Sequence, residues 1–249
     1  MTDRVAGVVL AAGAGVRLRP LSLLRPKALC PVGNVALVDL AIDRVLPEVG
    51  EVAVNVHHGR AAMEAHLAQR PVHCSIEEAE ALGTAGAIGH LRGWLDGRGA
   101  LVVNADAWCP GSLEDFVAGW DGVRVRLLAV GADTLTPATS IAGALLPWSE
   151  IARLDPTPSG LYERSWARAQ ADGRLEVVRH DGPFVDCGTP ADYLAANLAA
   201  SGGVSVVGDD AVVAGELEAS VVWPGGVVWP GERLVRAIRP DDITTVLVR

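Results

Sequence analysis

Basic residues that could bind a small anion are concentrated in one stretch near the start of the chain. From Arg4 to Val38 there are five basic residues and no acidic one, although the whole chain carries a formal net charge of −9. Four of the five fall within residues 10–32, LAAGAGVRLRPLSLLRPKALCPV: Arg17, Arg19, Arg25 and Lys27, which is the chain's only lysine. A local positive region in an acidic protein favours the capture of a highly charged anion.

Glycines in the same stretch favour phosphate as that anion. Gly13 and Gly15 follow the apolar run Val8–Leu10, and glycine lets backbone N–H groups approach a ligand closely. Successive N–H groups form a nest that suits phosphate, to which Arg17 would add a fork of donors and Lys27 a compact charge. The stretch lacks the Gly-Lys-Ser/Thr of a Walker loop and the third glycine of a dinucleotide fingerprint. An ordinary glycine-rich turn is the alternative.

Two aspartates stand where they could share a divalent cation. Asp106 follows the apolar run Leu101–Val103, and Asp186 precedes a helix that is expected to begin near Pro190. Mg²⁺ prefers few carboxylates together with water and phosphate oxygens. The pair could hold this ion if the fold brings the two side chains together; otherwise each is a turn or capping residue.

A second glycine- and threonine-rich segment, residues 77–88 (EEAEALGTAGAI), leads into another expected helix. A turn of small residues admits a flat ring against the backbone. Capping of the helix by Thr84 is the alternative. The segment is therefore a candidate site for a ligand with a flat ring.

Short apolar runs that alternate with helical patterns must position these residues. The expected strands are Val5–Leu10, Glu51–Val56, Val72–Ile76, Ala100–Asn104 and Val123–Val130. The expected helices are Val35–Leu46, Arg60–Gln69, Thr84–Trp94 and Ser112–Trp120. This alternation predicts an α/β fold, a parallel sheet with helices on both faces whose ligands lie beyond the carboxyl ends of the strands.

The last part of the chain repeats with a period of six residues. Val222-Trp-Pro-Gly-Gly-Val is followed directly by Val228-Trp-Pro-Gly-Glu-Arg, and Val207 and Val213 keep the same spacing upstream. Hexads of this kind favour a parallel β-helix over a valine-rich hairpin with Pro-Gly turns. We therefore predict a tail, residues 201–249, that stabilises the chain or joins copies of it into a homo-oligomer.

Composition excludes several classes of protein. Half of the 249 residues are hydrophobic, which predicts a packed core, and the acidic balance disfavours nucleic acid as a partner. The four cysteines are widely spaced without a C-x-x-C pair, which disfavours a zinc site or a disulfide scaffold and fits a reducing cytoplasm. Neither a signal segment nor an apolar run of membrane-spanning length is apparent, so we expect a cytoplasmic protein without a membrane partner.

Taken together, the motifs resemble those of the sugar-phosphate nucleotidyltransferases over about residues 5–200. The matching segments are Gly13-x-Gly15-x-Arg17-Leu18-x-Pro20, Pro26-Lys27-x-Leu29-x-Pro31, Leu82-Gly83-Thr84-Ala85-Gly86, Asn104-x-Asp106 and Asp186-x-Gly188-Thr189-Pro190. The compact length of the chain resembles that of the N-acetylmuramate-1-phosphate uridylyltransferases in that family. The hexads at its end resemble those of the mannose-1-phosphate guanylyltransferases.

The resemblance implies a catalytic domain over residues 1–200 with a Rossmann-like mixed, mainly parallel sheet, and a short left-handed parallel β-helix after it. It also implies a reaction in which a sugar 1-phosphate attacks a nucleoside triphosphate and releases pyrophosphate. Arg17, Lys27, Asp106 and Asp186 would be catalytic, with both aspartates holding Mg²⁺. The nucleotide-binding residues would be Leu10, Ala11, Ala12, Gly13, Gly15, Glu78, Gly83 and Thr84.

The nucleotide base and the sugar are less well defined. Glu78 aligns with a base-contacting position of the family, and a carboxylate can only accept hydrogen bonds. It would suit the N3–H of uracil or the N1–H and N2–H₂ of guanine, so UTP or GTP is favoured; a solvated residue is the alternative. Candidate acceptor-binding residues are Asn55, Trp108 and Gly143, with His58 and Trp148 as further candidates.

One departure from the family leaves other functions open. Between Val130 and Gly143 the chain has no counterpart of the lysine with which many relatives hold the sugar phosphate. A non-catalytic regulatory subunit that binds nucleotide sugars is therefore an alternative. A CTP-dependent cytidylyltransferase of a phospho-amino-alcohol is another.

Overall fold

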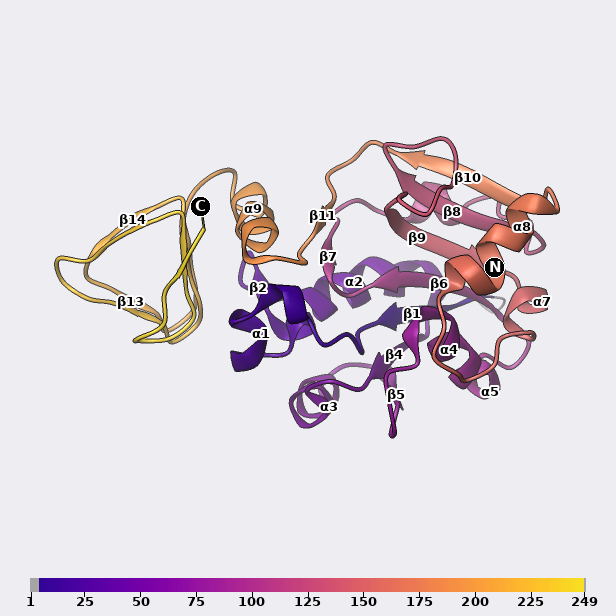
Figure 1. Cartoon of the computed structure of the whole chain (residues 1–249), viewed down its shortest axis with the longest axis horizontal. Coiled ribbons are helices and arrows are strands. Elements are labelled where there is room, and N and C mark those ends of the chain that lie inside the picture. The colour runs from indigo at the N-terminus through magenta and orange to yellow at the C-terminus, as the bar shows by residue number, and fades with distance from the viewer. Residues whose placement is uncertain (1–4, 249) are drawn as a thin grey trace. The chain divides into compact units, whose positions relative to one another are not determined.

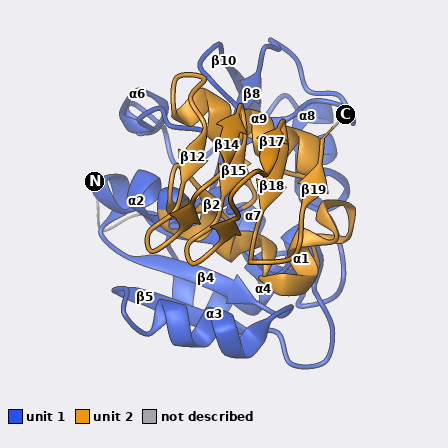
Figure 2. Cartoon of the chain, turned by 90° about the vertical axis from the view of Figure 1, so that its left-hand side faces the viewer, with its two compact units in different colours: residues 1–13, 40–105, 109–184 blue, residues 14–39, 106–108, 185–249 orange. Residues whose placement is uncertain are grey.

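A computed structural model describes residues 5–248 of the chain, which form two compact units (Figure 2). The first unit comprises residues 1–13, 40–105 and 109–184, and the second comprises residues 14–39, 106–108 and 185–249. The units thus divide the chain elsewhere than at residue 201, because two early segments belong with the tail. The boundary between residues 200 and 201 stays a prediction.

The first unit is built on a seven-stranded sheet in the described residues, with the strand order β10-β8-β9-β6-β1-β4-β5 (Figure 1). Its strands are β1 (Val5–Leu10), β4 (Val52–Val56), β5 (Val72–Ile76), β6 (Gly99–Asn104), β8 (Val125–Val130), β9 (Ile141–Leu146) and β10 (Leu175–His180). β9 runs antiparallel to both of its neighbours, whereas the other adjacent strands of this sheet are parallel. The prediction of a mixed, mainly parallel sheet is therefore confirmed. β9 and β10 were not among the expected strands.

Helices pack on both faces of this sheet, as predicted. Along β1, Ala6 and Val8 face a core that includes Ile88 of α4 (Gly83–His90) and Leu95 of α5 (Arg92–Leu95). Gly7 points the other way, where an added Cβ would lie 2.4 Å from Val45 of α2 (Leu37–Val49). The period of two along a strand thus places α2 opposite α4 and α5.

The helices of the first unit are shorter than predicted in several places. The α-helices are α2 (Leu37–Val49, which begins in the second unit), α3 (Arg60–Leu67), α4 (Gly83–His90), α5 (Arg92–Leu95), α6 (Glu114–Val117), α7 (Trp148–Ile151) and α8 (Ala167–Ala171), and the π-helix η4 (Tyr162–Trp166) leads into α8. The helix expected over Thr84–Trp94 is divided at Leu91 into α4 and α5. The one expected over Ser112–Trp120 is reduced to the single turn of α6. Among the described residues, no helix is long and apolar enough to cross a membrane.

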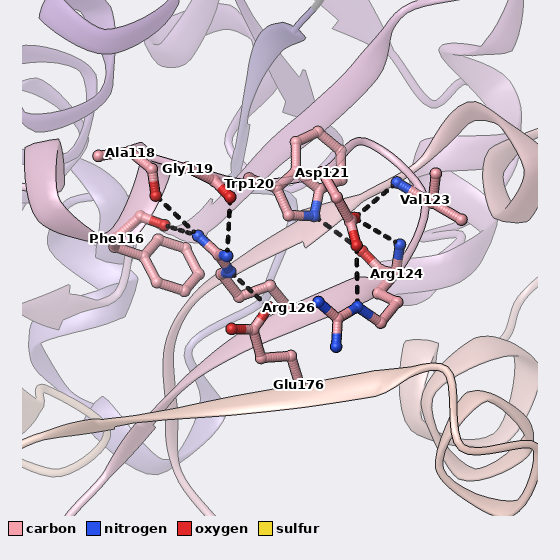
Figure 3. Close-up of polar contacts among 9 residues, drawn as sticks. All are labelled: Phe116, Ala118, Gly119, Trp120, Asp121, Val123, Arg124, Arg126 and Glu176. Atoms are coloured by element: carbon pink, nitrogen blue, oxygen red, sulfur yellow. Dashed lines mark hydrogen bonds and ion pairs between the residues drawn. The ribbon is translucent and has the colours of Figure 1, made fainter.

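A buried arginine of β8 links this strand to β10 and to the end of α6 (Figure 3). Arg126 of β8 lies opposite Glu176 of β10 and donates to its carboxylate over 2.8 Å. The same guanidinium donates to three carbonyls around the end of α6, those of Phe116, Ala118 and Gly119. A buried cation is stable only when it is paired and its hydrogen bonds are made, and here both conditions hold.

The second unit joins the basic stretch to an antiparallel ribbon and to the tail. Its elements before the tail are the 3-10 helices η2 (Val16–Leu18) and η3 (Lys27–Leu29) together with α1 (Leu21–Leu24), β2 (Pro31–Val32), β3 (Val35–Ala36), β7 (Ala107–Trp108), β11 (Val185–Asp186) and α9 (Pro190–Ala200). Thr189 caps α9 by accepting a hydrogen bond from the backbone N–H of Asp192, and Pro190 follows at the first helical position. The helix therefore begins where the sequence predicted.

The tail forms short parallel ladders between successive turns of the chain, which Figure 1 shows as the sides of a triangle. Its strands are β12 (Val206–Val207), β13 (Val212–Val213), β14 (Glu216–Glu218), β15 (Val221–Val222), β16 (Val227–Val228), β17 (Arg233–Val235), β18 (Ala237–Arg239) and β19 (Val246–Leu247). Three parallel ladders form: β12, β15 and β18 make the first, β13 and β16 the second, and β14 and β17 the third. β19 pairs with β18 in antiparallel orientation at the edge of the first ladder. Val222, Val228 and Leu234, which recur at the six-residue period, are buried together.

Candidate functional site

The loop after β1 is held by hydrogen bonds within the first unit. The backbone N–H of Ala11 donates to Oδ1 of Asn55 over 2.7 Å, and the carbonyl of Ala12 lies 2.9 Å from Nδ1 of His58. The carbonyl of Leu10 accepts from the N–H of Ala105 over 2.9 Å. Gly13, by contrast, has no atom within 4 Å of the position of an added Cβ. The loop is thus fixed at its base and open at Gly13, where a ligand can approach the backbone.

Four charged side chains meet in the second unit, and they are the four predicted to be catalytic. Nζ of Lys27 lies 2.8 Å from Oδ2 of Asp106 and 3.5 Å from Oδ1 of Asp186. Arg17 lies 3.5 Å from the other carboxylate oxygen of Asp186. We call this set, Arg17, Lys27, Asp106 and Asp186, the charged cluster.

The ribbon of β7 and β11 explains how the two aspartates meet. Ala107 pairs with Asp186 in antiparallel register, and the N–H of Cys187 donates to the carbonyl of Asp106 over 2.9 Å. Lys27 reaches the ribbon from the turn after Pro26, with Asp106 and Asp186 respectively 79 and 159 positions further along the chain. Long-range pairing, which no local pattern reveals, therefore creates the cluster.

Burial differs sharply within the charged cluster. The Lys27 side chain is only 8% exposed, whereas those of Asp106 and Asp186 are 47% and 51% exposed. A nearly buried ammonium needs the carboxylates as partners, while the exposed carboxylate oxygens remain accessible to a ligand. The cluster contains two basic and two acidic side chains, and a charged substrate could replace some of the ion pairs between them.

The chemistry of this donor set fits a magnesium ion. In residues 5–248, no group of three or more His, Cys, Asp or Glu side chains is placed to hold a metal. Asp106 and Asp186 would give a divalent cation two carboxylates and leave its other positions to water and phosphate oxygens. Mg²⁺ is the ion that prefers this arrangement.

Two thiols lie near the charged cluster without the character of nucleophiles. Burial raises the pKa of Cys30 and that of Cys187 to about 12. Because the thiolate is the reactive form, both sulfurs stay neutral and inert at ordinary pH.

The candidate base turn, Leu82–Gly86, is fixed by the segment that follows α7. An added Cβ on Gly83 would lie 2.6 Å from the carbonyl oxygen of Ser159, and one on Gly86 would lie 2.3 Å from that of Thr157. The Thr84 hydroxyl accepts a hydrogen bond from the N–H of Leu161 over 2.8 Å. Close backbone contact therefore accounts for the small residues at this turn, and Thr84 has a tertiary partner.

Two adjacent glutamates before this turn have opposite surroundings. Glu78, the predicted base contact, is 76% exposed and forms an ion pair with Arg60 over 3.0 Å. Glu77 is only 3% exposed; its carboxylate accepts from Nδ2 of Asn55 over 2.7 Å and from the N–H of Leu82 over 2.8 Å. Sequence reasoning missed Glu77, although the strand alternation that buries Ser75 also points Glu77 inward.

Asn55, Trp108 and Gly143, the predicted acceptor-binding residues, lie on three different strands, β4, β7 and β9. Asn55 is buried on β4, and its amide is engaged by Ala11 and Glu77. Gly143 lies on β9, separated from β4 in the sheet by β6 and β1, where an added Cβ would face Leu113 and Phe116 at 3.6 Å. Trp108 belongs to the second unit, Trp148 packs against the core of the first, and His58 contacts the loop carbonyl of Ala12.

Comparison with known proteins places these observations in a family context. The model of the family described as Nucleotidyl transferase matches residues 6–122. The N-acetylmuramate alpha-1-phosphate uridylyltransferase of Caulobacter vibrioides is 34% identical over 227 residues, covering 76% of this chain and 94% of that protein.

Two further proteins that are similar to this chain are also named as nucleotidyltransferases of sugar 1-phosphates. The catalytic subunit beta of mannose-1-phosphate guanylyltransferase from Dictyostelium discoideum is 24% identical, over 75% of this chain but only 62% of that protein. A solved structure of a glucose-1-phosphate thymidylyltransferase from Bacillus anthracis, in complex with a sucrose, superposes with a TM-score of 0.67. The two sequences are 18% identical, and the match covers 79% of this chain and 95% of the solved one. The similarity therefore supports the fold alone.

Proposed function

The chain belongs to the sugar-phosphate nucleotidyltransferase family and is a sugar-1-phosphate nucleotidyltransferase, and from this premise we propose that it joins UTP to a sugar 1-phosphate. The observation that carries the proposal is the Lys27 ammonium, held between the carboxylates of Asp106 and Asp186. The uridylyltransferase from Caulobacter vibrioides, at 34% identity, supports UTP as the donor. GTP is the second choice, because the carboxylate of Glu78 suits either base.

In the proposed reaction, an oxygen of the sugar phosphate attacks the α-phosphorus of the triphosphate. A new P–O bond forms there, the bond from the α-phosphorus to the bridging oxygen of the β-phosphate breaks, and pyrophosphate leaves. Phosphate oxygens are already nucleophilic, so no side chain needs to take up a proton or form a covalent bond. Positioning of two repelling anions and stabilisation of charge on the leaving group are therefore the main contributions of the protein.

The charged cluster supplies these contributions. Arg17, whose long side chain is exposed, would bind the β- and γ-phosphates, while Lys27 would lie against the reacting phosphates. Asp106 and Asp186 would hold Mg²⁺, which neutralises phosphate charge when bound. Because Lys27 keeps its place through these same carboxylates, it is preorganised for its role.

The nucleotide-binding roles fall to residues 10–15 and to the base turn. The backbone of Leu10, Ala11, Ala12 and Gly13, with Gly15, would bind phosphate. Gly83 and Thr84 would border the base, and Glu78 would exchange Arg60 for a ring N–H. We reassign Asn55 from sugar binding to the positioning of the loop, together with Glu77. Trp108 and Gly143 stay candidates for acceptor binding.

The parallel ladders of the tail support a short left-handed parallel β-helix, through which copies of the chain would associate. A hairpin would pair its strands in antiparallel, whereas β12, β15 and β18 are parallel to one another. All four cysteines are unpaired, which supports a reducing cytoplasm as the location.

Pyrophosphate release measured over a grid of nucleotides and sugar 1-phosphates, with Mg²⁺, tests the proposed function. We expect release with UTP and one sugar 1-phosphate, and its loss in Lys27→Met. Release with GTP or CTP instead would reassign the donor, and a phospho-amino-alcohol included as acceptor tests the cytidylyltransferase alternative. A folded wild-type protein that releases pyrophosphate from no pair would overturn the proposal.

A further inference from the structure

The tail contains two copies of the tetrapeptide Val-Trp-Pro-Gly whose tryptophans have different surroundings. Trp223 in the first copy is 2% exposed, whereas Trp229 in the second is 53% exposed. The indole N–H of Trp229 donates to the carbonyl of Asp242, within the tail itself, over 3.3 Å. Since the two residues hold the same place in their hexads, the repeat does not explain why Trp223 is buried.

Trp223 is buried by α9 and by the segment that carries Lys27. Its indole N–H donates to the hydroxyl of Tyr193 over 2.9 Å, and the two rings meet edge to face with centroids 6.3 Å apart. The Tyr193 hydroxyl in turn donates to the carbonyl of Pro31. Burial raises the pKa of Tyr193, so the hydroxyl keeps the proton that this bond requires.

A second contact joins Trp223 to the other end of the same segment. The guanidinium of Arg25 lies over the indole ring, 4.9 Å from its centroid. A cation over the face of a tryptophan is attracted by the ring quadrupole, and burial strengthens this attraction. Trp223 thus contacts Arg25 directly and Pro31 through Tyr193.

Arg25 and Pro31 bracket the short segment that presents Lys27. Between them, the thiol of Cys30 lies 3.8 Å from the carbonyl oxygen of Arg25 and 3.7 Å from that of Pro26. Asn197 also donates to the Pro31 carbonyl, over 3.3 Å. The segment is therefore closed on itself, and both of its ends rest on residues of α9 and the tail.

We propose that Trp223 is a positioning residue, through which the tail holds the Arg25–Pro31 segment so that the Lys27 ammonium stays between Asp106 and Asp186. This inference rests on the proposed function, in which Lys27 lies against the reacting phosphates. A displacement of about 1 Å in such a group can lower a rate by up to about a hundredfold. The tail would thereby serve catalysis in each chain, in addition to the role in stability or assembly that is predicted for it.

The duplicated tetrapeptide supplies a matched pair of variants, Trp223→Phe and Trp229→Phe. Each removes one indole N–H and part of one ring, but only the first touches Tyr193 and Arg25. Because Lys27 is the only lysine, its modification by an amine-acetylating reagent can be followed by peptide mass spectrometry without interference from another lysine. We expect Trp223→Phe to raise the rate of Lys27 acetylation about tenfold and Trp229→Phe to leave it within about twofold of wild type.

Steady-state kinetics give a second readout. Trp223→Phe should lower kcat about tenfold and leave the KM of the nucleotide within about twofold, because a misplaced Lys27 weakens the transition state more than binding. Tyr193→Phe, which removes a single hydroxyl, should change both readouts in the same direction. Circular dichroism checks that every variant is folded at the assay temperature.

Two outcomes are decisive. If folded Trp223→Phe and Trp229→Phe proteins match in Lys27 acetylation and in kcat, Trp223 has only a structural role and the inference is wrong. If the wild type releases no pyrophosphate from any substrate pair, the proposed function fails instead. The acetylation rates then still decide whether Trp223 holds Lys27 in place.

Discussion

The side-chain amide of Asn55 donates to the carboxylate of Glu77 over 2.7 Å, deep in the first unit. Asn55 also accepts from the N–H of Ala11 and Glu77 from that of Leu82, so the pair links the loop after β1 to the base turn. Each of these donors thus faces an acceptor along the series of hydrogen bonds. A change of either side chain alone should therefore leave two donors or two acceptors facing each other.

Exchange of the amide of Asn55 and the carboxylate of Glu77 between the two positions should restore the stability that either single substitution lowers. Glu77→Gln places an amide against a donor, and Asn55→Asp places a carboxylate against a carboxylate; each should cost about 1–3 kcal/mol of unfolding free energy. In the double variant, the introduced aspartate accepts from the N–H of Ala11 and from the introduced glutamine, whose own carbonyl oxygen accepts from Leu82. A double-mutant cycle by urea unfolding measures the coupling, and Glu80→Gln, at an exposed position, is the control. Additive losses would refute the matched series.

Asp106→Asn tests the charged cluster with almost no change of shape. The variant removes the closest anionic partner of Lys27 and one carboxylate that would hold Mg²⁺. We expect kcat to fall by about 10²–10³, with the thermal unfolding transition retained. Asp115→Asn removes an exposed charge on α6 and should leave turnover unchanged. Mg²⁺-dependent turnover at the wild-type rate in Asp106→Asn would contradict the assignment.

Gly86→Ala should unfold or distort the base turn. Its Cβ would lie 2.3 Å from the Thr157 carbonyl oxygen, and a backbone atom cannot move aside as a flexible side chain can. Overpacking of this kind costs about 1–3 kcal/mol. Gly93→Ala on α5 meets no atom within 4 Å and should be neutral or stabilising by up to about 1 kcal/mol. Equal melting temperatures for the two variants would show that the turn can yield.

Arg126→Met should destabilise the first unit far more than Arg124→Met, although both residues lie in the same region (Figure 3). Arg126 is nearly buried, and its loss leaves Glu176 and three carbonyls without their donor, at a cost of about 3–5 kcal/mol. Arg124 pairs with Asp121 at the surface, where solvent screens the ion pair, so its loss should cost little stability. Urea unfolding of both variants compares the two costs, and equal costs would contradict the prediction.

Glu150 should contribute to the loss of stability in acid. Burial raises its pKa, but hydrogen bonds from Arg174, Arg168 and Ser165 outweigh this, so the pKa lies below its ordinary value. The unfolded chain then binds this proton more readily, so the stabilisation is present above about pH 4.3, the ordinary pKa of a glutamate, and is lost as the pH falls through the folded pKa. Glu150→Gln should be less stable than wild type at pH 7, and the two curves should converge in acid. Parallel curves from about pH 7 to about pH 3 would exclude this role.

Local sequence patterns predicted much of the first unit. Apolar runs bounded by turns identified β1, β4, β6 and β8, because a strand that is buried on both faces is apolar over most of its length. The edge strand β5 was also predicted, although it is only partly buried. β9 and β10 were missed: β9 carries alanine and glycine, and β10 mixes polar and charged residues with apolar ones. Their pairing in the sheet, rather than their own composition, makes them strands.

The sequence by itself indicated the chemistry that we propose for this protein: a glycine loop and basic residues that would bind phosphate, and two aspartates that would bind a cation. Tertiary structure alone decided which of these groups meet. The register of β7 against β11 brings Asp106 and Asp186 to Lys27, and contacts outside the repeat distinguish Trp223 from Trp229. The physical reason is that residue type and spacing specify what a side chain can do within a few residues, whereas the pairing of distant segments depends on the free energy of the whole fold.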